Sequence, residues 1–404
     1  MSRDVEYGVA RHPTLHPSAL YALARTAVVW PHLTAAPSSW VLSLLHTAGG
    51  FNGPGRMAFD ARGNVWVSNN FAPGTRNDPG LGVISLDPTG SPANGSPIVG
   101  GGLMGAWWGI AVDQRNHIWT ANYTGDDPIP FYDAGFIGGH TVSEFTSAGA
   151  PVSASGYTQG SLSGPQGIAV DRRGNIWIAN HTNNTVTEYP HGDPAAARIV
   201  TGGGLSKPFA VVVDAQGNVW VDDNAIDRTD TGQLTRISPD GVAHGPIAAG
   251  RLSSPQGMAF DQSGHLWVAN LGSSSVTEMS AAGRLLRRIR ATSMVGPWSV
   301  AVDGAGNVWV ASFLKGSLTE LCGASTAACP PGATTGQVIS PLPAGFTNGG
   351  LQHLTAVQVD ESGNVWVANN WRRIAPPLGG NGLVEFIGAA APVRTPLIGP
   401  PQQP

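Results

Sequence analysis

Hydrophobic and polar residues alternate in a phrase that returns seven times along the chain. It is clearest in AVDRRGNIWIAN, which begins at Ala169, and in AFDQSGHLWVAN, which begins at Ala259. Apolar residues occupy every second position before an aspartate and again around a tryptophan, with a four-residue break between the two runs. A period of two indicates β-strands, and two such runs with a short break indicate a hairpin. The seven anchoring aspartates are Asp60, Asp113, Asp171, Asp214, Asp261, Asp303 and Asp360.

The break has the composition of a tight turn. Three residues after the aspartate stands glycine in six copies and Asn116 in the seventh. Glycine and asparagine are the residues that enter the left-handed region at the lowest cost. The aspartate is suited to accept hydrogen bonds from the turn backbone. We therefore predict a turn that is closed by a left-handed residue in every copy.

The spacing of the copies predicts the fold class. Successive aspartates are 42 to 58 residues apart, and each hairpin is followed by a third strand, as in NTVTEYP and SSVTEMS, and by a fourth, as in GPIAAG. Four strands per unit at this period indicate an all-β, seven-bladed β-propeller of four-stranded blades over residues 39–404. Residues 1–38 are expected to be a helical or irregular segment, the remnant of a longer chain. Two segments, Trp40 to Thr47 and Pro392 to Ile398, compete to close the last blade.

Strand parity separates the predicted core from the predicted channel. Bulky residues directly before the aspartate are expected between blades: Phe59, Val112, Val170, Val213, Phe260, Val302 and Val359. Mostly small residues one position earlier are expected to line the central channel: Ala58, Ala111, Ala169, Val212, Ala259, Ala301 and Gln358. The repeated tryptophans are predicted to be core rather than ligand-binding: Trp66, Trp119, Trp177, Trp220, Trp267, Trp309 and Trp366.

Composition and charge exclude some partners. The chain holds 55 Gly and 32 Pro among 404 residues, with a net charge of -4. Its only lysines are Lys207 and Lys315, so no basic stripe follows a nucleic-acid backbone. No apolar run reaches the length of about 20 residues that spans a bilayer. We expect a monomer with no nucleic-acid partner and no membrane span.

The two cysteines of the chain indicate the cellular compartment in which the protein is found. Cys322 and Cys329 flank GASTAA in a predicted loop, which favours one small disulfide and an oxidising compartment. We therefore expect an extracytoplasmic protein, whether periplasmic, secreted or on the cell surface, although no secretory signal is visible in this chain.

The phrase AVDxxGNxWVAN, preceded by GPQGI at Gly164 and SPQGM at Ser254, resembles the NHL-repeat propellers and the neighbouring virginiamycin B lyase-like (streptogramin lyase) family. The resemblance covers about Trp40 to Ile398. For the lyases it implies second strands that end in Trp-Phe-Thr-Glu, and a histidine and glutamate constellation with magnesium. Here those strands end in Asn69, Asn122, Asn180, Asp223, Asn270, Ser312 and Asn369.

This departure favours a non-enzymatic propeller that binds a small polar molecule, a glycan or a protein, with no cofactor. One alternative is a virginiamycin B lyase-like C–O lyase or a lactonase that uses the same face, with magnesium or calcium. A second is a structural propeller that follows a larger N-terminal region, since Pro17 to Ser39 has the pattern of a helix and a linker. No catalytic residue can be named from the sequence for the enzymatic alternative, and no metal site is visible in it.

The candidate ligand site lies where first strands begin and second strands end, because both emerge on one face of a propeller. We call this face the channel-mouth face. Long loops on a rigid scaffold concentrate binding, and long loops follow the second strand in blades one, two, four and seven. The ligand-binding residues predicted there are Arg56, Trp108, Gln166, Phe209, Gln256 and Trp298. The aromatic residues among them, with Trp107 and Trp371, either form a platform for a ligand or pack at the rim of the propeller.

Several polar groups have two interpretations. Arg56 either anchors a ligand or pairs with Asp222 or Asp223. The asparagines at the strand ends either bind a ligand or satisfy local turn backbone. Carboxylate-rich loops (Asp126, Asp127 and Asp133; Asp222, Asp223, Asp227 and Asp230) are expected to be solvated rather than to bind calcium. The recurring third-strand glutamates, Glu144, Glu188, Glu278, Glu320 and Glu385, are expected on a solvated face.

Overall fold

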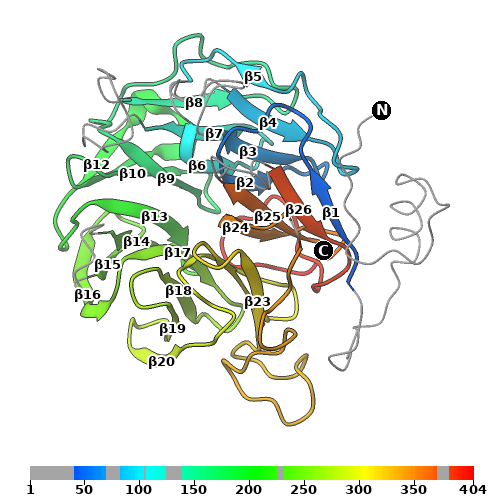
Figure 1. Cartoon of the computed structure of the whole chain (residues 1–404). Helices are drawn as coiled ribbons and strands as arrows, with labels where there is room; N and C mark the ends of the chain where they lie inside the picture. Colours follow the sequence, from blue (N-terminus) through cyan, green and yellow to red (C-terminus); the bar gives the residue numbers. More distant parts are fainter. Residues whose placement is uncertain are drawn as a thin grey trace.

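Seven antiparallel sheets form a ring in the computed structural model of the chain (Figure 1). It describes residues 41–69, 82–103, 106–123, 139–224, 232–348, 350–370 and 382–404. The first strand of every blade packs against the first strand of the next one, and this closes the ring around a central axis. The predicted seven-bladed β-propeller is confirmed.

The strands follow the repeated phrases. Blade 1 holds β2 (Pro54–Phe59), β3 (Val65–Asn69), β4 (Gly82–Leu86) and β5 (Ile98–Val99). Blade 2 holds β6 (Ala106–Val112), β7 (Ile118–Asn122) and β8 (Thr141–Phe145). Blade 3 holds β9 (Pro165–Val170), β10 (Ile176–Asn180), β11 (Thr185–Tyr189) and β12 (Arg198–Val200), with two short 3-10 helices, Pro190–Gly192 and Pro194–Ala196, before β12.

The second half of the ring repeats the plan. Blade 4 holds β13 (Pro208–Val213), β14 (Val219–Asp223), β15 (Gly232–Ile237) and β16 (Ala243–Leu252). Blade 5 holds β17 (Pro255–Phe260), β18 (Leu266–Asn270), β19 (Ser275–Met279) and β20 (Leu285–Ile289). Blade 6 holds β21 (Pro297–Val302), β22 (Val308–Ser312) and β23 (Ser317–Leu321). Blade 7 holds β24 (His353–Val359), β25 (Val365–Asn370), β26 (Gly382–Phe386) and the N-terminal strand β1 (Ser43–His46).

Blade 7 is closed by the N-terminal segment. Strand β1 pairs antiparallel with β26, from Ser43 opposite Phe386 to His46 opposite Leu383. His46 adds side-chain contacts, since its Nε2 lies 3.0 Å from Glu385 Oε2 and its ring stacks on Trp366 at 5.1 Å. Burial lowers the pKa of His46 to about 4, so the neutral imidazole donates to the Glu385 carboxylate. The competing segment, Pro392 to Ile398, lies elsewhere.

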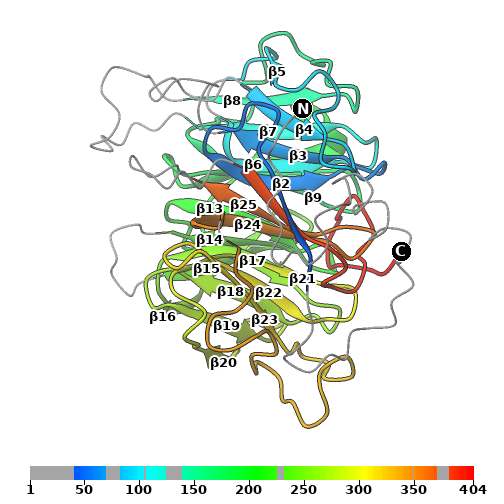
Figure 2. The ribbon, with the colours of Figure 1, turned by 45° about the vertical axis from the view of Figure 1, so that its right-hand side comes forward.

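Residues 391–404, which we call the C-terminal segment, contain that stretch and run across the face that carries the seven aspartate turns, which we call the turn face. In the turn of blade 6 the Gly304 amide donates to the Ala391 carbonyl, and in the turn of blade 1 the Asp60 carbonyl accepts the Thr395 hydroxyl. The Gln403 side chain returns to the Gly304 carbonyl. The segment, red in Figure 2, therefore ties the turns of non-adjacent blades together.

Blades 2 and 6 depart from the four-stranded plan. Each has three strands, and its fourth position is taken by segments that form isolated bridges. In blade 2, Phe145 is bridged to Pro151 and Val142 to Tyr157, and in blade 6, Leu321 is bridged to Val338. The blade 6 segment contains the Cys322–Cys329 disulfide, which confirms the predicted pairing.

The predicted turn is present in every copy, and it has a partner that sequence reasoning missed. One carboxylate oxygen of each aspartate accepts backbone N–H bonds within the turn, as Asp60 does from Arg62 and Asn64. The other accepts the indole N–H of the tryptophan six residues later, at 2.9 to 3.3 Å in all seven copies. Asn116 has a φ of 63°, as predicted, and its side chain also accepts the Ala61 amide of blade 1 at 2.8 Å.

The core lies between the blades. Seven hydrophobic clusters each join two neighbouring blades, and each contains one of the bulky residues that precede an aspartate. The seven repeated tryptophans are at most 1% exposed, which confirms their assignment to the core. The predicted channel residues line an axial cavity of about 150 Å³, which Val393, Thr395 and Leu397 line from the turn face.

The prediction for the third-strand glutamates was wrong. Glu144, Glu188, Glu278 and Glu385 are at most 4% exposed, and Glu320 is half-buried. Each pairs in register with a core tryptophan, as Glu144 does with Trp119, so it faces the interface between blades rather than solvent. Most of these carboxylates obtain a cationic or imidazole partner there.

Candidate functional site

An aromatic row crosses the mouth of the axial channel. Trp108, Phe209 and Trp298 stand at the same position of the repeat, five residues before the aspartate, in blades 2, 4 and 6. The Trp108 ring lies 5.2 Å from that of Trp298 and 6.1 Å from that of Phe209, between centroids. Three of the predicted site residues therefore meet, although they come from non-adjacent blades.

Two residues outside the predicted site extend this row. Phe313 lies 4.8 Å from Trp298, and His353 lies 4.7 Å from Phe313, between ring centroids. We call Phe209, Trp108, Trp298, Phe313 and His353 the aromatic row. Phe209 is buried, whereas the other four are half-buried. The row thus keeps part of its ring surface accessible, while each ring is held by contact with its neighbour in the row.

The predicted amides stand beside the row with unused hydrogen-bonding capacity. Gln166 is 3% exposed and Gln256 is 2% exposed, at the equivalent positions of blades 3 and 5. Within the described part of the chain, neither side-chain oxygen has a hydrogen-bond partner, and neither does the indole N–H of Trp298. Buried polar groups are nearly always satisfied, so these atoms indicate a polar ligand or ordered water at the mouth.

Arg56 crosses the channel beneath the mouth. Its guanidinium donates to the backbone carbonyl of Gln256 at 2.5 Å, which joins blade 1 to blade 5. Burial lowers the pKa of Arg56, and the carboxyl of Asp222 opposes that shift. The intramolecular interpretation of Arg56 therefore has a direct partner in Gln256 and an electrostatic one in Asp222.

The size of Arg56 is unusual at its position, four residues before the aspartate. Glycine occupies this position in blades 2, 3 and 5, where an added Cβ would lie 2.1 to 2.7 Å from a carbonyl oxygen of the next blade. Close approach of the blades requires glycine there. In blade 1 the side chain instead turns into the channel, which explains how a single arginine reaches the opposite side.

Asp222 and Asp223 are buried on β14, not solvated. Asp222 is 0% exposed, and it accepts the Ala210 amide at 2.5 Å. Burial raises the pKa of Asp222 to about 8, against the opposing effects of the Ala210 amide and Arg56. Burial likewise raises the pKa of Asp223 to about 7, and Asp223 accepts the Ser206 amide. Asp126, Asp127, Asp133, Asp227 and Asp230 lie outside the described residues, as does Trp371; so does the side chain of Trp107.

The asparagines at the strand ends serve local structure. Asn69 accepts the Asn52 amide at 2.6 Å and donates to the Gly50 carbonyl. Asn180 donates to Thr185 and Thr187 of the neighbouring strand. Asn69, Asn122, Asn180, Asn270 and Asn369 are all at most 1% exposed. Local hydrogen bonding, one of the two interpretations, accounts for this ring.

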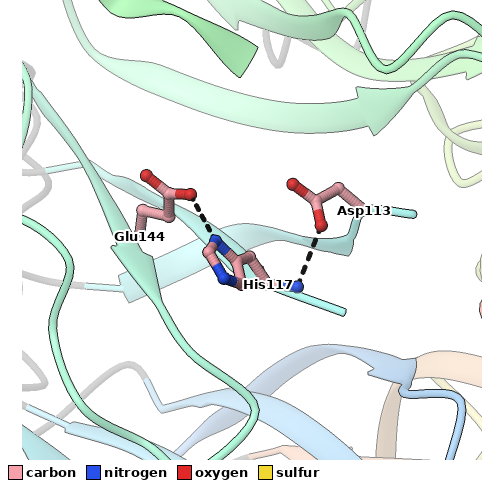
Figure 3. Close-up of side chains that lie close together, drawn as sticks. All are labelled: Asp113, His117 and Glu144. Carbon is pink, nitrogen blue, oxygen red and sulfur yellow. Dashed lines mark hydrogen bonds and ion pairs between the residues drawn. The ribbon is translucent and has the colours of Figure 1, made fainter. Parts of the chain in front are cut away.

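A metal-like cluster lies in blade 2, away from the mouth. Ligand atoms of Asp113, His117 and Glu144 fall within 4.8 Å of one another, and His117 Nδ1 lies 2.7 Å from Glu144 Oε1 (Figure 3). The Arg115 guanidinium bonds to both carboxylates, and Tyr157 donates to the second oxygen of Glu144. Blade 5 repeats the histidine–glutamate contact in His265 and Glu278 at 2.7 Å. A resident arginine and a repeated pair indicate a structural network rather than a cation site.

Comparison with known proteins agrees with the repeat and the ring. Residues 162–189 match the family model of the NHL repeat. They span the end of the loop before β9 and continue through β11, so they hold one hairpin and its third strand. No curated protein sequence matches the chain.

Solved structures share the fold at low identity. A streptogramin B lyase is similar with a TM-score of 0.63 and 13% identity, over 87% of this chain and 99% of the other. Virginiamycin B lyase from Staphylococcus aureus is similar with a TM-score of 0.59 and 14% identity, over 86% and 99%. The WD40 repeats of RRP9 are similar with a TM-score of 0.60 and 10% identity, over 87% of this chain and 99% of the other. Since lyases and a WD40 propeller match equally well, the similarity concerns the fold alone.

Proposed function

We propose that this protein is a non-enzymatic binding propeller that takes a small polar ligand with a flat apolar face, such as a pyranose sugar, on its channel-mouth face. The observation that carries the proposal is the contact of Trp108 with Trp298 at the channel mouth, beside two buried amides with unpartnered oxygens among the described residues. Aromatic rings stack on a flat apolar surface, and the amides bond to its polar rim.

The scaffold favours binding because it is already organised. Four of the five residues of the aromatic row belong to first strands that the closed ring holds in place, and Phe313 directly follows β22, so little ordering accompanies binding. The Cys322–Cys329 disulfide supports an extracytoplasmic location, where such bonds persist. Within the described part of the chain, no helix is long and apolar enough to cross a membrane.

A lyase or lactonase on the same face is the second candidate. One observation favours it: burial raises the pKa of Asp222, and its Oδ2 has no partner within the described part of the chain, which suits a general acid. Two observations favour binding. Asp222 is 0% exposed, and the histidine–glutamate pairs of the described residues lie within blades 2, 5 and 7 rather than at the mouth.

Thermal melting with a panel of monosaccharides, oligosaccharides, lactones and cyclic depsipeptides tests the proposal. A ligand of the folded state raises the melting temperature by mass action. Trp298→Ala is expected to lower the affinity of the ligand that binds by about tenfold or more, because stacking and hydrogen bonding contribute about 1 to 3 kcal/mol. Leu342→Ala, at a side chain that is 65% exposed in the loop after β23, is the control. A panel without any stabilising member contradicts the proposal.

The same panel separates the two candidates. A binding propeller returns every ligand unchanged, as mass spectrometry of the incubated ligand would show. Turnover that is lost in Asp222→Asn while the melting shift is retained would establish the lyase or lactonase instead.

A further inference from the structure

A second concave site lies on the turn face, opposite the aromatic row. It is a groove of about 410 Å³, within the range of small-molecule sites. One wall consists of turn residues of blades 1 to 3, including Asn116 and Arg172, and the other consists of the C-terminal segment, including Arg394, Leu397 and Ile398. The groove exists because that segment bridges the turns without filling the space beside them.

The charge of the groove is positive in a chain whose net charge is -4. Arg172 and Arg394 both line it and are both exposed, and its eleven lining residues include no aspartate or glutamate. Neither guanidinium has an ion pair within the described part of the chain. The turn of blade 2 shows the contrast, since Arg115 there is bonded to Asp113 and Glu144.

Asn116, a further polar residue of the groove, also presents a donor. Asn116 uses its side-chain oxygen to accept the Ala61 amide, which leaves its NH₂ group as a donor. The Glu361 carboxylate contacts the segment, since it accepts the Thr395 amide and hydroxyl at 3.0 Å, but it does not line the groove. Donors without a resident acid favour an anion, and two guanidinium groups suit a carboxylate or a phosphate.

The apolar wall narrows the ligand class. Pro396, Leu397, Ile398 and Pro400 lie beside the two arginines. An inorganic ion would leave this surface exposed, whereas an organic acid would cover it with its hydrocarbon part and gain about 25 cal/mol per Å². We propose that the turn face carries a second ligand site, which binds an amphipathic organic anion between Arg172 and Arg394.

Isothermal titration of the whole protein with hexanoate at constant ionic strength tests this site. Its neutral analogue hexanamide and inorganic phosphate are the comparison probes. We expect hexanoate to bind, hexanamide to bind at least tenfold more weakly and phosphate to bind more weakly than hexanoate. Phosphate binding as tight as hexanoate would overturn the organic part of the proposal, and equal binding of hexanamide would overturn the anionic part.

Variants place the site and separate it from the proposed function. Arg172→Ala and Arg394→Ala are each expected to lower the affinity for hexanoate at least fivefold. Arg62 is an exposed turn-face arginine outside the groove, so Arg62→Ala should leave that affinity unchanged. Trp298→Ala, on the other face, also leaves it unchanged. Hexanoate that does not bind, or whose affinity both arginine variants leave intact, overturns the proposal without affecting the proposed function.

Discussion

Trp108 and Trp298 belong to blades 2 and 6, and their ring centroids lie 5.2 Å apart. Trp108 also contacts Phe209 of blade 4, so its ring joins three non-adjacent blades at the channel mouth. Arg56 makes a similar crossing below them, from blade 1 to the Gln256 carbonyl of blade 5. The channel mouth is therefore a built surface of aromatic and amide groups rather than an opening.

The buried carboxyl of Asp222 predicts a pH dependence of stability. Its pKa is 3.8 when unfolded and about 8 in the folded state, so folding favours its protonated form. Its contribution to the free energy of unfolding is complete below about pH 4 and is lost as pH rises through about 8. Asp222→Asn cannot titrate, so wild type should lose about 2 to 5 kcal/mol relative to this variant between pH 4 and pH 9. Urea unfolding at several pH values measures this, and parallel curves would contradict the burial of the carboxyl.

The aspartate turns predict unequal effects of two substitutions. Gly174 has a φ of 78°, so Gly174→Val should lower the free energy of unfolding by about 1 to 2 kcal/mol. Asn116→Gly relieves backbone strain at a φ of 63° but removes the bond to the Ala61 amide. These effects oppose each other, and the net change should stay below about 1 kcal/mol. Denaturant midpoints of the two variants measure the difference, and equal midpoints would refute the turn assignment.

The disulfide predicts a measurable loss on removal. Cys322 and Cys329 are seven residues apart and hold the segment that completes blade 6. For so short a loop, chain entropy predicts that the double substitution to serine lowers the free energy of unfolding by about 2 kcal/mol. Thiol titration of unreduced protein made in an oxidising compartment is the control. Two free thiols in that protein would show that the bond does not form.

The number of blades, the hairpin turns and the core residues could be predicted from the sequence, because each copy of the repeat carries its own turn, strand parity and core tryptophan. The ring of small residues around the axis and the bulky residues between blades follow from parity alone. The burial of the glutamates did not follow from the sequence, since Glu144 faces inward only because it is in register with Trp119. The sequence did carry a signal for this burial, because a glutamate recurs on the third strand of five blades, and in each of them it pairs with the core tryptophan.

The site was harder to predict than the fold. Counting five residues back from the aspartate found Trp108, Phe209 and Trp298, which the structure brings together. Phe313 and His353 were not predicted, because both lie outside the repeat position that was counted: Phe313 follows β22, and His353 begins β24, seven residues before Asp360. The Arg56 crossing also escaped, because the partner carbonyl is 200 residues away in the chain. Contacts across a closed ring depend on blade number and tilt, which no single repeat encodes.

The most direct test of a binding site on the aromatic row is 19F NMR of protein labelled with 5-fluorotryptophan. Trp108→Phe and Trp298→Phe assign the two resonances of interest among those of the 13 tryptophans. When a ligand that raises the melting temperature is added, these two resonances should shift while those of the seven core tryptophans stay in place. A bound ligand that leaves both the Trp108 and the Trp298 resonances unmoved would contradict the account.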